Sequence, residues 1–156
     1  MSETLTASTV VDATPAAVFA VLADPTEHIA IDGTGWLREA LDPRPLTAQG
    51  QVFRVAMFHV GHPAKNYEIA NKVIVWEADR AIAWAPARAR DDGELEFGGQ
   101  TWRYDLEPVG AGQTRVTLTY DFSAVPAAMR ERIQIPPFPP SHLDDSLANL
   151  AAMSFG

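Results

Sequence analysis

The sequence predicts an α+β fold built on one curved antiparallel sheet, with helices near both ends of the chain. Three observations support this prediction. A strand-like segment and a helical pattern open the chain, and the hydrophobic period then changes to two from residue 36 to residue 123. Short turns separate the later strands, which favours pairing between sequence neighbours. A helical pattern returns in the final segment, so helices and strands are segregated along the chain.

The N-terminal segment is expected to form a strand followed by two short helices. Residues 5–11 are rich in β-branched side chains in an alternating pattern. Thr14 is placed to cap a helix that begins at Pro15, because its hydroxyl can accept a first-turn N–H bond and proline suits the first helical position. Pro25 ends this helix, and residues 25–31 are expected to form the second one.

Six further strands are expected, arranged as a meander. Tight turns at Asp79-Arg80 and at residues 110–112 predict that the strands on either side of each pair as hairpins. Residues 88–99, which combine charges and glycines, are expected to be a polar loop. With the N-terminal strand the sheet has seven strands, and the six others are expected at residues 36–41, 51–60, 65–77, 81–85, 101–108 and 114–123.

The C-terminal helix is expected to be broken by a proline run. Residues 125–133 have a helical pattern with Met129 and Ile133 on one face. The segment Pro136–Pro140 cannot be helix interior, because prolines lack the N–H donor and have fixed backbone angles. Residues 141–144 match a capping box, which predicts a last helix with its leucines on one stripe.

The composition is that of an ordinary globular domain. The chain has 156 residues, 47% of them hydrophobic and 21% charged, and we expect a single domain over residues 1–156. The absence of cysteine excludes disulfides, thiolate zinc sites and a cysteine nucleophile. A net charge of −8 argues against nucleic-acid binding. With no basic leader and no apolar run of membrane-spanning length, we expect a cytoplasmic protein without a membrane span.

Strand alternation places many aromatic and polar side chains on one face of the sheet. A dry core normally holds fewer groups that need hydrogen-bond partners, whereas an apolar cavity with a few directed polar groups suits this set. The alternative is that the rings lie at strand ends with their polar tips in water. The predicted inner-face residues that carry this argument are Phe53, Met57, His59, Tyr67, Asn71, Trp84, Trp102, Tyr104 and Tyr120.

Two short motifs could carry chemistry, but each has a simpler explanation. His59 and His62 offer two imidazoles, yet Gly61 and Pro63 place His62 in a turn and no carboxylate ligand is suitably spaced. We therefore predict no metal site. The segment 32–35, Asp-Gly-Thr-Gly, superficially resembles a catalytic aspartate turn, but aspartic proteases need two such carboxylates. A connection between helix and strand explains it.

Several stretches resemble the SRPBCC superfamily, the START-like or Bet v 1-like helix-grip domains that include bacterial polyketide cyclase/dehydrase-like proteins. The resemblance covers essentially the whole chain and is specific for fold rather than function. The loop sequence HIAIDGTG at residues 28–35 is similar to one common in members described as polyketide cyclases. The other similar stretches are residues 11–25, 71–77 with 80–84, 101–108 and 114–121.

The resemblance implies that the sheet wraps the C-terminal helix and that a cavity between them holds an apolar ligand. The inner-face residues would line this cavity from the sheet. From the helical side, the resemblance implies contributions from Met129, Ile133, Leu143, Leu147 and Leu150. The break at residues 136–140 departs from the unbroken helix of the family.

Three functions remain open at the sequence level. The first is binding of a small apolar ligand, aromatic or polyketide- or lipid-like, with no cofactor. The second is an enzyme similar to polyketide aromatase/cyclases, for which His59, Tyr67 and Tyr104 are the best candidates to move protons, with Tyr120 as a further one. The third is a partner-binding module similar to Hsp90 activators, in which the proline run with Phe138 is a docking edge. The oligomeric state is left open.

Overall fold

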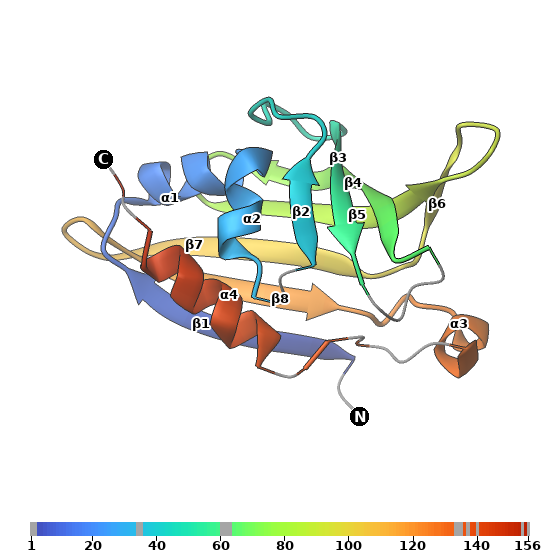
Figure 1. The fold of residues 1–156 in the computed structure, drawn as a ribbon. Helices are drawn as coiled ribbons and strands as arrows, with labels where there is room; N and C mark the ends of the chain where they lie inside the picture. Colours follow the sequence, from blue (N-terminus) through green and yellow to red (C-terminus); the bar gives the residue numbers. More distant parts are fainter. Residues whose placement is uncertain are drawn as a thin grey trace.

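A curved antiparallel sheet forms the framework of the protein (Figure 1). The computed structural model describes residues 3–33, 36–59, 64–132, 136, 138–139, 141–153 and 155. Seven strands follow the order β1-β8-β7-β5-β4-β3-β2, and β6 pairs with β5 outside this path. The strands are β1 (Thr4–Val11), β2 (Leu37–Ala40), β3 (Val52–Phe58), β4 (Asn66–Glu77), β5 (Ala81–Ala89), β6 (Leu95–Phe97), β7 (Thr101–Gly110) and β8 (Gln113–Asp121).

The helices lie near the two ends of the chain, as predicted. They are α1 (Pro15–Leu22), a 3₁₀ turn (Pro25–Glu27), α2 (His28–Ile31), α3 (Ala127–Arg132) and α4 (His142–Ala151). Helix α4 packs along β1 and contacts α2, whereas α3 stands apart from α4 in Figure 1. The helix-grip class and the interrupted C-terminal helix are confirmed. No helix in the described part of the chain is long and apolar enough to cross a membrane.

The two predicted helix starts differ in how they are capped. The Ala17 backbone N–H donates to Thr14 Oγ1 over 3.2 Å and Pro15 is the first residue of α1, as the sequence predicts. Helix α4 also begins where expected, but Ser141 makes no side-chain capping bond. Ser141 has helical backbone angles (φ −72°, ψ −8°), whereas a capping serine needs an extended backbone to reach the first-turn donors. The predicted capping box is therefore wrong.

The predicted polar loop at residues 88–99 contains regular structure. Strand β5 continues to Ala89, and its last residues pair with β6 while its first residues pair with β7. Arg88 and Glu96 face each other in this hairpin, with a guanidinium-to-carboxylate distance of 2.9 Å. Most side chains here are exposed, so the strands lack the apolar alternation that identifies a half-buried strand.

A β-bulge changes which side chain of β4 faces the core. Alternation predicts that Val73 and Val75 share the inner face, but the pairing of β4 with β5 shifts register between them. One extra residue reverses the alternation beyond it. Trp76, not Val75, therefore packs inward, with its ring 5.0 Å from that of Phe19 on α1.

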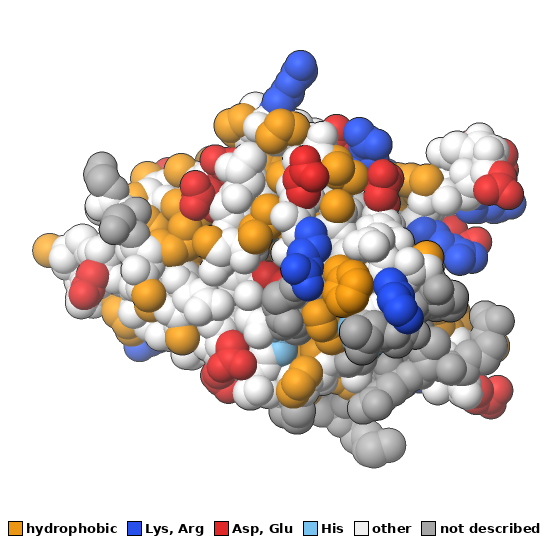
Figure 2. Space-filling view, viewed as in Figure 1, with side chains coloured by type: hydrophobic (Ala, Val, Ile, Leu, Met, Phe, Trp, Pro, Cys, Tyr) orange, Lys and Arg blue, Asp and Glu red, His pale blue; other side chains and the backbone are white. Residues whose placement is uncertain are grey.

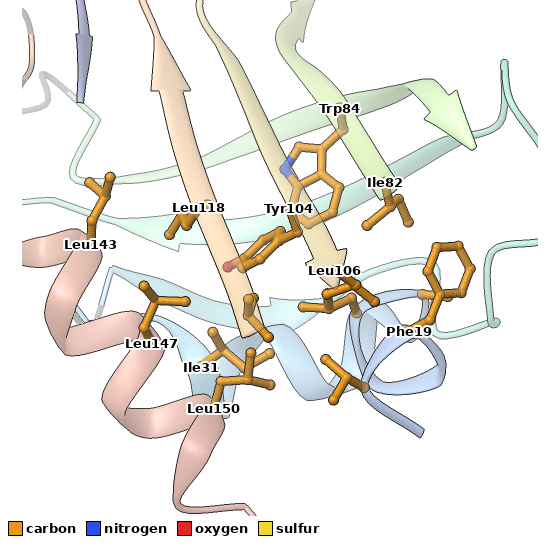
Figure 3. Close-up of a cluster of buried hydrophobic side chains, with 14 of the residues drawn as sticks. Phe19, Ile31, Ile82, Trp84, Tyr104, Leu106, Leu118, Leu143, Leu147 and Leu150 are labelled. Carbon is orange, nitrogen blue, oxygen red and sulfur yellow. The ribbon is translucent and has the colours of Figure 1, made fainter. Parts of the chain in front are cut away.

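The core lies between the inner face of the sheet and helices α1, α2 and α4. Figure 3 shows Leu143, Leu147 and Leu150 projecting from α4 toward Ile31 and the strands. Leu147 and Leu150 are fully buried. On the outer surface shown in Figure 2, acidic and basic side chains are interspersed and hydrophobic side chains form small groups.

Candidate functional site

A cavity of about 230 Å³ lies between the sheet and helices α2 and α4. Six strands contribute its sheet wall: Leu37 from β2; Phe53, Val55 and Met57 from β3; Tyr67, Ile69 and Asn71 from β4; Trp84 and Pro86 from β5; Trp102 and Tyr104 from β7; Leu118 and Tyr120 from β8. The other described lining residues are His28, Ile31, Asp32, Trp36, Gln100, Phe138, His142 and Ser146. The lining is therefore mostly apolar and aromatic, with a few polar groups.

Eight of the nine inner-face residues named from the sequence line this cavity. They are Phe53, Met57, Tyr67, Asn71, Trp84, Trp102, Tyr104 and Tyr120. The period of two brought them together correctly because each comes from a regular part of its strand. Figure 3 shows Trp84 and Tyr104 side by side on neighbouring strands, and their ring centroids are 5.9 Å apart. That these residues bind a ligand remains a proposal.

The ninth inner-face residue, His59, and the proposed contacts on the helical side are not among the described lining residues. His59 packs its ring edge-on against Trp36, at 4.3 Å between centroids, so it lies behind a cavity-wall residue. Leu143, Leu147 and Leu150 belong to the packed core. Met129 is partly buried on α3. His62 and Ile133 fall outside the described residues, so the pair of His59 with His62 is not placed.

Sequence reasoning proposed none of five polar residues in the described cavity lining: His28, Asp32, Gln100, His142 and Ser146. His28 and Asp32 lie at the start and just beyond the end of α2, and His142 is the first residue of α4. A local signal existed for residues 142 and 146, which share one face of α4. Helix α2 has only four residues, too few for periodicity to identify the face that carries His28.

His28 is held as a neutral ring against the cavity wall. Its Nε2 donates to the carbonyl oxygen of Leu22 over 2.7 Å, and its ring stacks on Trp84 at 4.9 Å. Burial lowers the pKa of His28 below its ordinary value, against smaller raising effects of the Leu22 hydrogen bond and Asp24. Because a carbonyl can only accept, the neutral ring carries its proton on Nε2 and presents Nδ1 as an acceptor.

In His142, by contrast, the ring nitrogen Nδ1 is buried and makes no hydrogen bond to any described residue. The ring packs against Phe138 and Trp102, at 4.7 and 5.5 Å between centroids. Burial lowers the pKa of His142, and the charges of Asp32 and Asp145 offset part of this effect.

Asp32 brings negative charge to the cavity wall. Its Oδ2 accepts the Leu37 backbone N–H over 3.0 Å. Burial and then the charge of Asp32 raise the pKa values of Tyr67 and Tyr104. Burial also raises the pKa of Tyr120 to about 12, so these phenols are neutral donors near pH 7.

The described residues do not form a metal centre. No group of three or more His, Asp or Glu side chains among them is arranged to hold a metal ion. The polar groups of the cavity are instead suited to hydrogen bonding with an organic ligand: neutral phenols, neutral imidazoles, one amide from Asn71 and one carboxylate.

Comparison with known proteins identifies the family. A family model described as "Polyketide cyclase / dehydrase and lipid transport" matches residues 2–153. The chain belongs to this family. The membership confirms the resemblance to SRPBCC proteins, and the family description supports binding of a hydrophobic ligand.

Solved structures share the fold of this family member at low sequence identity. Protein Ms6760 from Mycobacterium smegmatis is 14% identical with a TM-score of 0.67, covering 96% of this chain and 89% of that chain. A protein from Arthrobacter aurescens is 14% identical with a TM-score of 0.69, covering 96% and 84%. The Aha1 dimer from Colwellia psychrerythraea is 14% identical with a TM-score of 0.59, covering 95% and 92%. These likenesses show the fold alone.

Curated relatives include a longer protein. "Uncharacterized protein Rv0088" of Mycobacterium tuberculosis is 30% identical over 116 residues, which cover 74% of this chain and 46% of the relative. The chain thus spans about half the length of the curated relatives it matches.

Proposed function

We propose that this family member binds a small, largely apolar ligand in the cavity between the sheet and helices α2 and α4. The observation that carries the proposal is the cavity itself, about 230 Å³ of unfilled space walled by aromatic rings. Well-packed side chains in this space would stabilise the domain, so the open space supports a binding role.

The cavity wall is suited to flat, apolar molecules. Trp102 and Tyr120 lie 4.5 Å apart between ring centroids, and Phe138 packs against both. Aromatic faces and edges of this kind favour ring ligands, because offset and edge-to-face contacts add to the effect of apolar burial.

A blocking variant tests the proposal against a matched control. Ile69→Trp places extra bulk on the cavity wall, whereas Ile74→Trp adds the same bulk on the same strand outside the described lining. Isothermal titration with a neutral two-ring compound such as naphthol is expected to show binding to the wild type. Ile69→Trp should weaken it at least tenfold and Ile74→Trp should leave it within about twofold. Equal affinities for all three folded proteins would overturn the proposal.

A second experiment identifies the natural ligand. Native mass spectrometry of protein purified from its own host is expected to show an adduct that disappears in Ile69→Trp and persists in Ile74→Trp. An adduct retained in both variants would place the ligand elsewhere on the molecule.

Proton-transfer catalysis is a second candidate. The specific observation that favours it is the gathering of neutral Tyr67 and Tyr104 with Asp32, His28 and His142 around one cavity. Such groups can hold a carbonyl and move a proton, as cyclisation and dehydration of a polyketide require. Loss of turnover of a poly-β-ketone mimic in Tyr104→Phe tests it.

Partner binding like that of Hsp90 activators has weaker support. Phe138, the apolar centre of the suggested docking edge, is only 7% exposed and packs inside against Trp102 and Tyr120. The Aha1 likeness concerns the fold alone.

A further inference from the structure

We propose that Asn71 sets the specificity of the cavity: its side-chain amide binds a neutral substituent of the ligand that can both donate and accept a hydrogen bond. The inference rests on the proposed ligand-binding function, and it names the residue and the chemical group that determine which ligands bind. Three observations carry it: the burial of Asn71, the apolar surroundings of its side chain and its unmet hydrogen-bonding capacity.

Asn71 lies in the wall of the cavity on the inner face of β4. It precedes the β-bulge between Val73 and Val75, so regular alternation places it on the same face as Ile69 and Val73. Only 6% of the residue is exposed. Asparagine is rarely buried to this extent, and a buried amide normally has hydrogen-bond partners.

The immediate neighbours of Asn71 on this face are apolar. Phe53 on β3 and Pro86 on β5 lie directly opposite it in the two strand pairings. Ile69 and Val73 are the next residues on the same face of β4. None of these four side chains can donate or accept a conventional hydrogen bond. The amide is therefore a polar group within an apolar part of the cavity wall.

The hydrogen-bonding capacity of this amide is unused within the described chain. An asparagine amide offers two N–H donors and two acceptor lone pairs. No side-chain hydrogen bond joins Asn71 to another described residue. By comparison, His28 uses one ring nitrogen in its bond to Leu22. A ligand group that pairs with the amide thus gains affinity, whereas a ligand that covers it with hydrocarbon leaves a buried polar group unpaired.

The chemistry of this part of the wall favours a neutral partner group. The amide carries no charge, and an ionised ligand group beside apolar neighbours would lose its hydration without a compensating charge there. A hydroxyl group, or the N–H and C=O edge of a lactam, can pair with both halves of the amide.

Three matched ligands test the inference. 2-Naphthol, 2-methoxynaphthalene and 2-methylnaphthalene share one ring system. Their substituents respectively donate and accept a hydrogen bond, only accept one, and do neither. By isothermal titration, we expect the wild type to bind 2-naphthol at least about tenfold more tightly than 2-methylnaphthalene, with 2-methoxynaphthalene between them.

Two variants with the same replacement assign this preference to one residue. Asn71→Leu keeps the branched shape of the side chain and removes its polar atoms. It should reduce the preference for 2-naphthol over 2-methylnaphthalene to less than about threefold, and it should raise the melting temperature of the ligand-free protein. Asn66→Leu makes the same replacement at an exposed position of β4 outside the described lining, and it should keep the wild-type preference.

The outcomes separate this inference from the function on which it rests. Equal affinities of the wild type for 2-naphthol and 2-methylnaphthalene, or a full preference in folded Asn71→Leu, would overturn the role of Asn71 and leave ligand binding standing. If Asn71→Leu does not fold, as judged by circular dichroism, Asn71→Ala takes its place in the same comparison. Failure of all three compounds to bind the wild type would overturn both.

Discussion

Replacing His142 with leucine is expected to stabilise the folded protein, although the residue is buried. The imidazole Nδ1 lies without a hydrogen-bond partner among the described residues. A buried polar atom left in this state costs about 1–3 kcal/mol. Leucine has a similar volume and no polar atom, so it removes this cost while it keeps the position filled.

The magnitude follows from the contacts that change. The variant gains about 2 kcal/mol from the lost polar atom and gives up the ring contacts to Phe138 and Trp102, together about 1 kcal/mol. The net stabilisation at pH 8 is about 1 kcal/mol. A second difference appears in acid. Burial lowers the folded-state pKa of His142. Below pH 6.5 its imidazole is therefore protonated more readily in the unfolded chain than in the folded protein.

The stability of the wild type should therefore fall as the pH drops from 6.5 toward the folded-state pKa of His142. Over that window the advantage of His142→Leu widens by at most about 1.4 kcal/mol per pH unit. His28 is present in both proteins, so its own acid sensitivity, of the same sign, cancels in the difference.

Urea unfolding followed by circular dichroism at pH 8 and pH 5.5 measures both effects. Ser146→Ala, one turn further along α4, changes no titrating group and should follow the pH dependence of the wild type. A variant that is less stable than the wild type at pH 8, or that has the same pH dependence, would refute the reasoning.

Two other predictions concern backbone and core. Gly93 has φ +86° and open space around it, so Gly93→Ala should lower the free energy of unfolding by about 1 kcal/mol. Gly99 has φ +99°, and a new Cβ there would lie 2.5 Å from the Ala124 carbonyl oxygen. Gly99→Ala should therefore lower the free energy of unfolding by at least about 3 kcal/mol. Calorimetric melting temperatures compare them, and equal losses would contradict the predicted clash. Leu147→Ala should cost about 2–5 kcal/mol in urea unfolding because the side chain is fully buried. The affinity of Leu147→Ala for naphthol should stay within about threefold of the wild-type value. A tenfold loss of affinity would show that Leu147 contributes to the ligand site.

The strand part of the site could be predicted from the sequence because alternation is a local property. Phe53, Trp84, Trp102 and Tyr120 each follow their neighbours in a period of two, and the sheet needs only correct pairing to bring them together. The same rule failed at Trp76, where a bulge inserts one residue. Such a bulge depends on how two strands meet, so it leaves no clear local pattern.

The helical part of the site depended on long-range packing. Asp32 follows a helix of only four residues, too short for periodicity to identify its inner face. His142 becomes a cavity residue because α4 is fixed to the end of α2, where Asn149 Nδ2 donates to the Ile31 carbonyl oxygen and the Gly33 N–H donates to Ser146 Oγ. These bonds join residues more than a hundred positions apart in the chain, so local sequence patterns cannot predict them.

The position of β1 has a consequence for the order in which the molecule assembles. The first strand pairs along its whole length with β8, and the Thr114 hydroxyl, 101 positions away, donates to the carbonyl oxygen of Ala13 beside it. Helix α4 in turn packs along β1. Closing so long a loop is slow, so the hairpins joining β4 to β5 and β7 to β8 should form earlier. During synthesis, β1 can therefore pair with β8 only after most of the chain has been made. The cavity is complete only when α4 packs against β1.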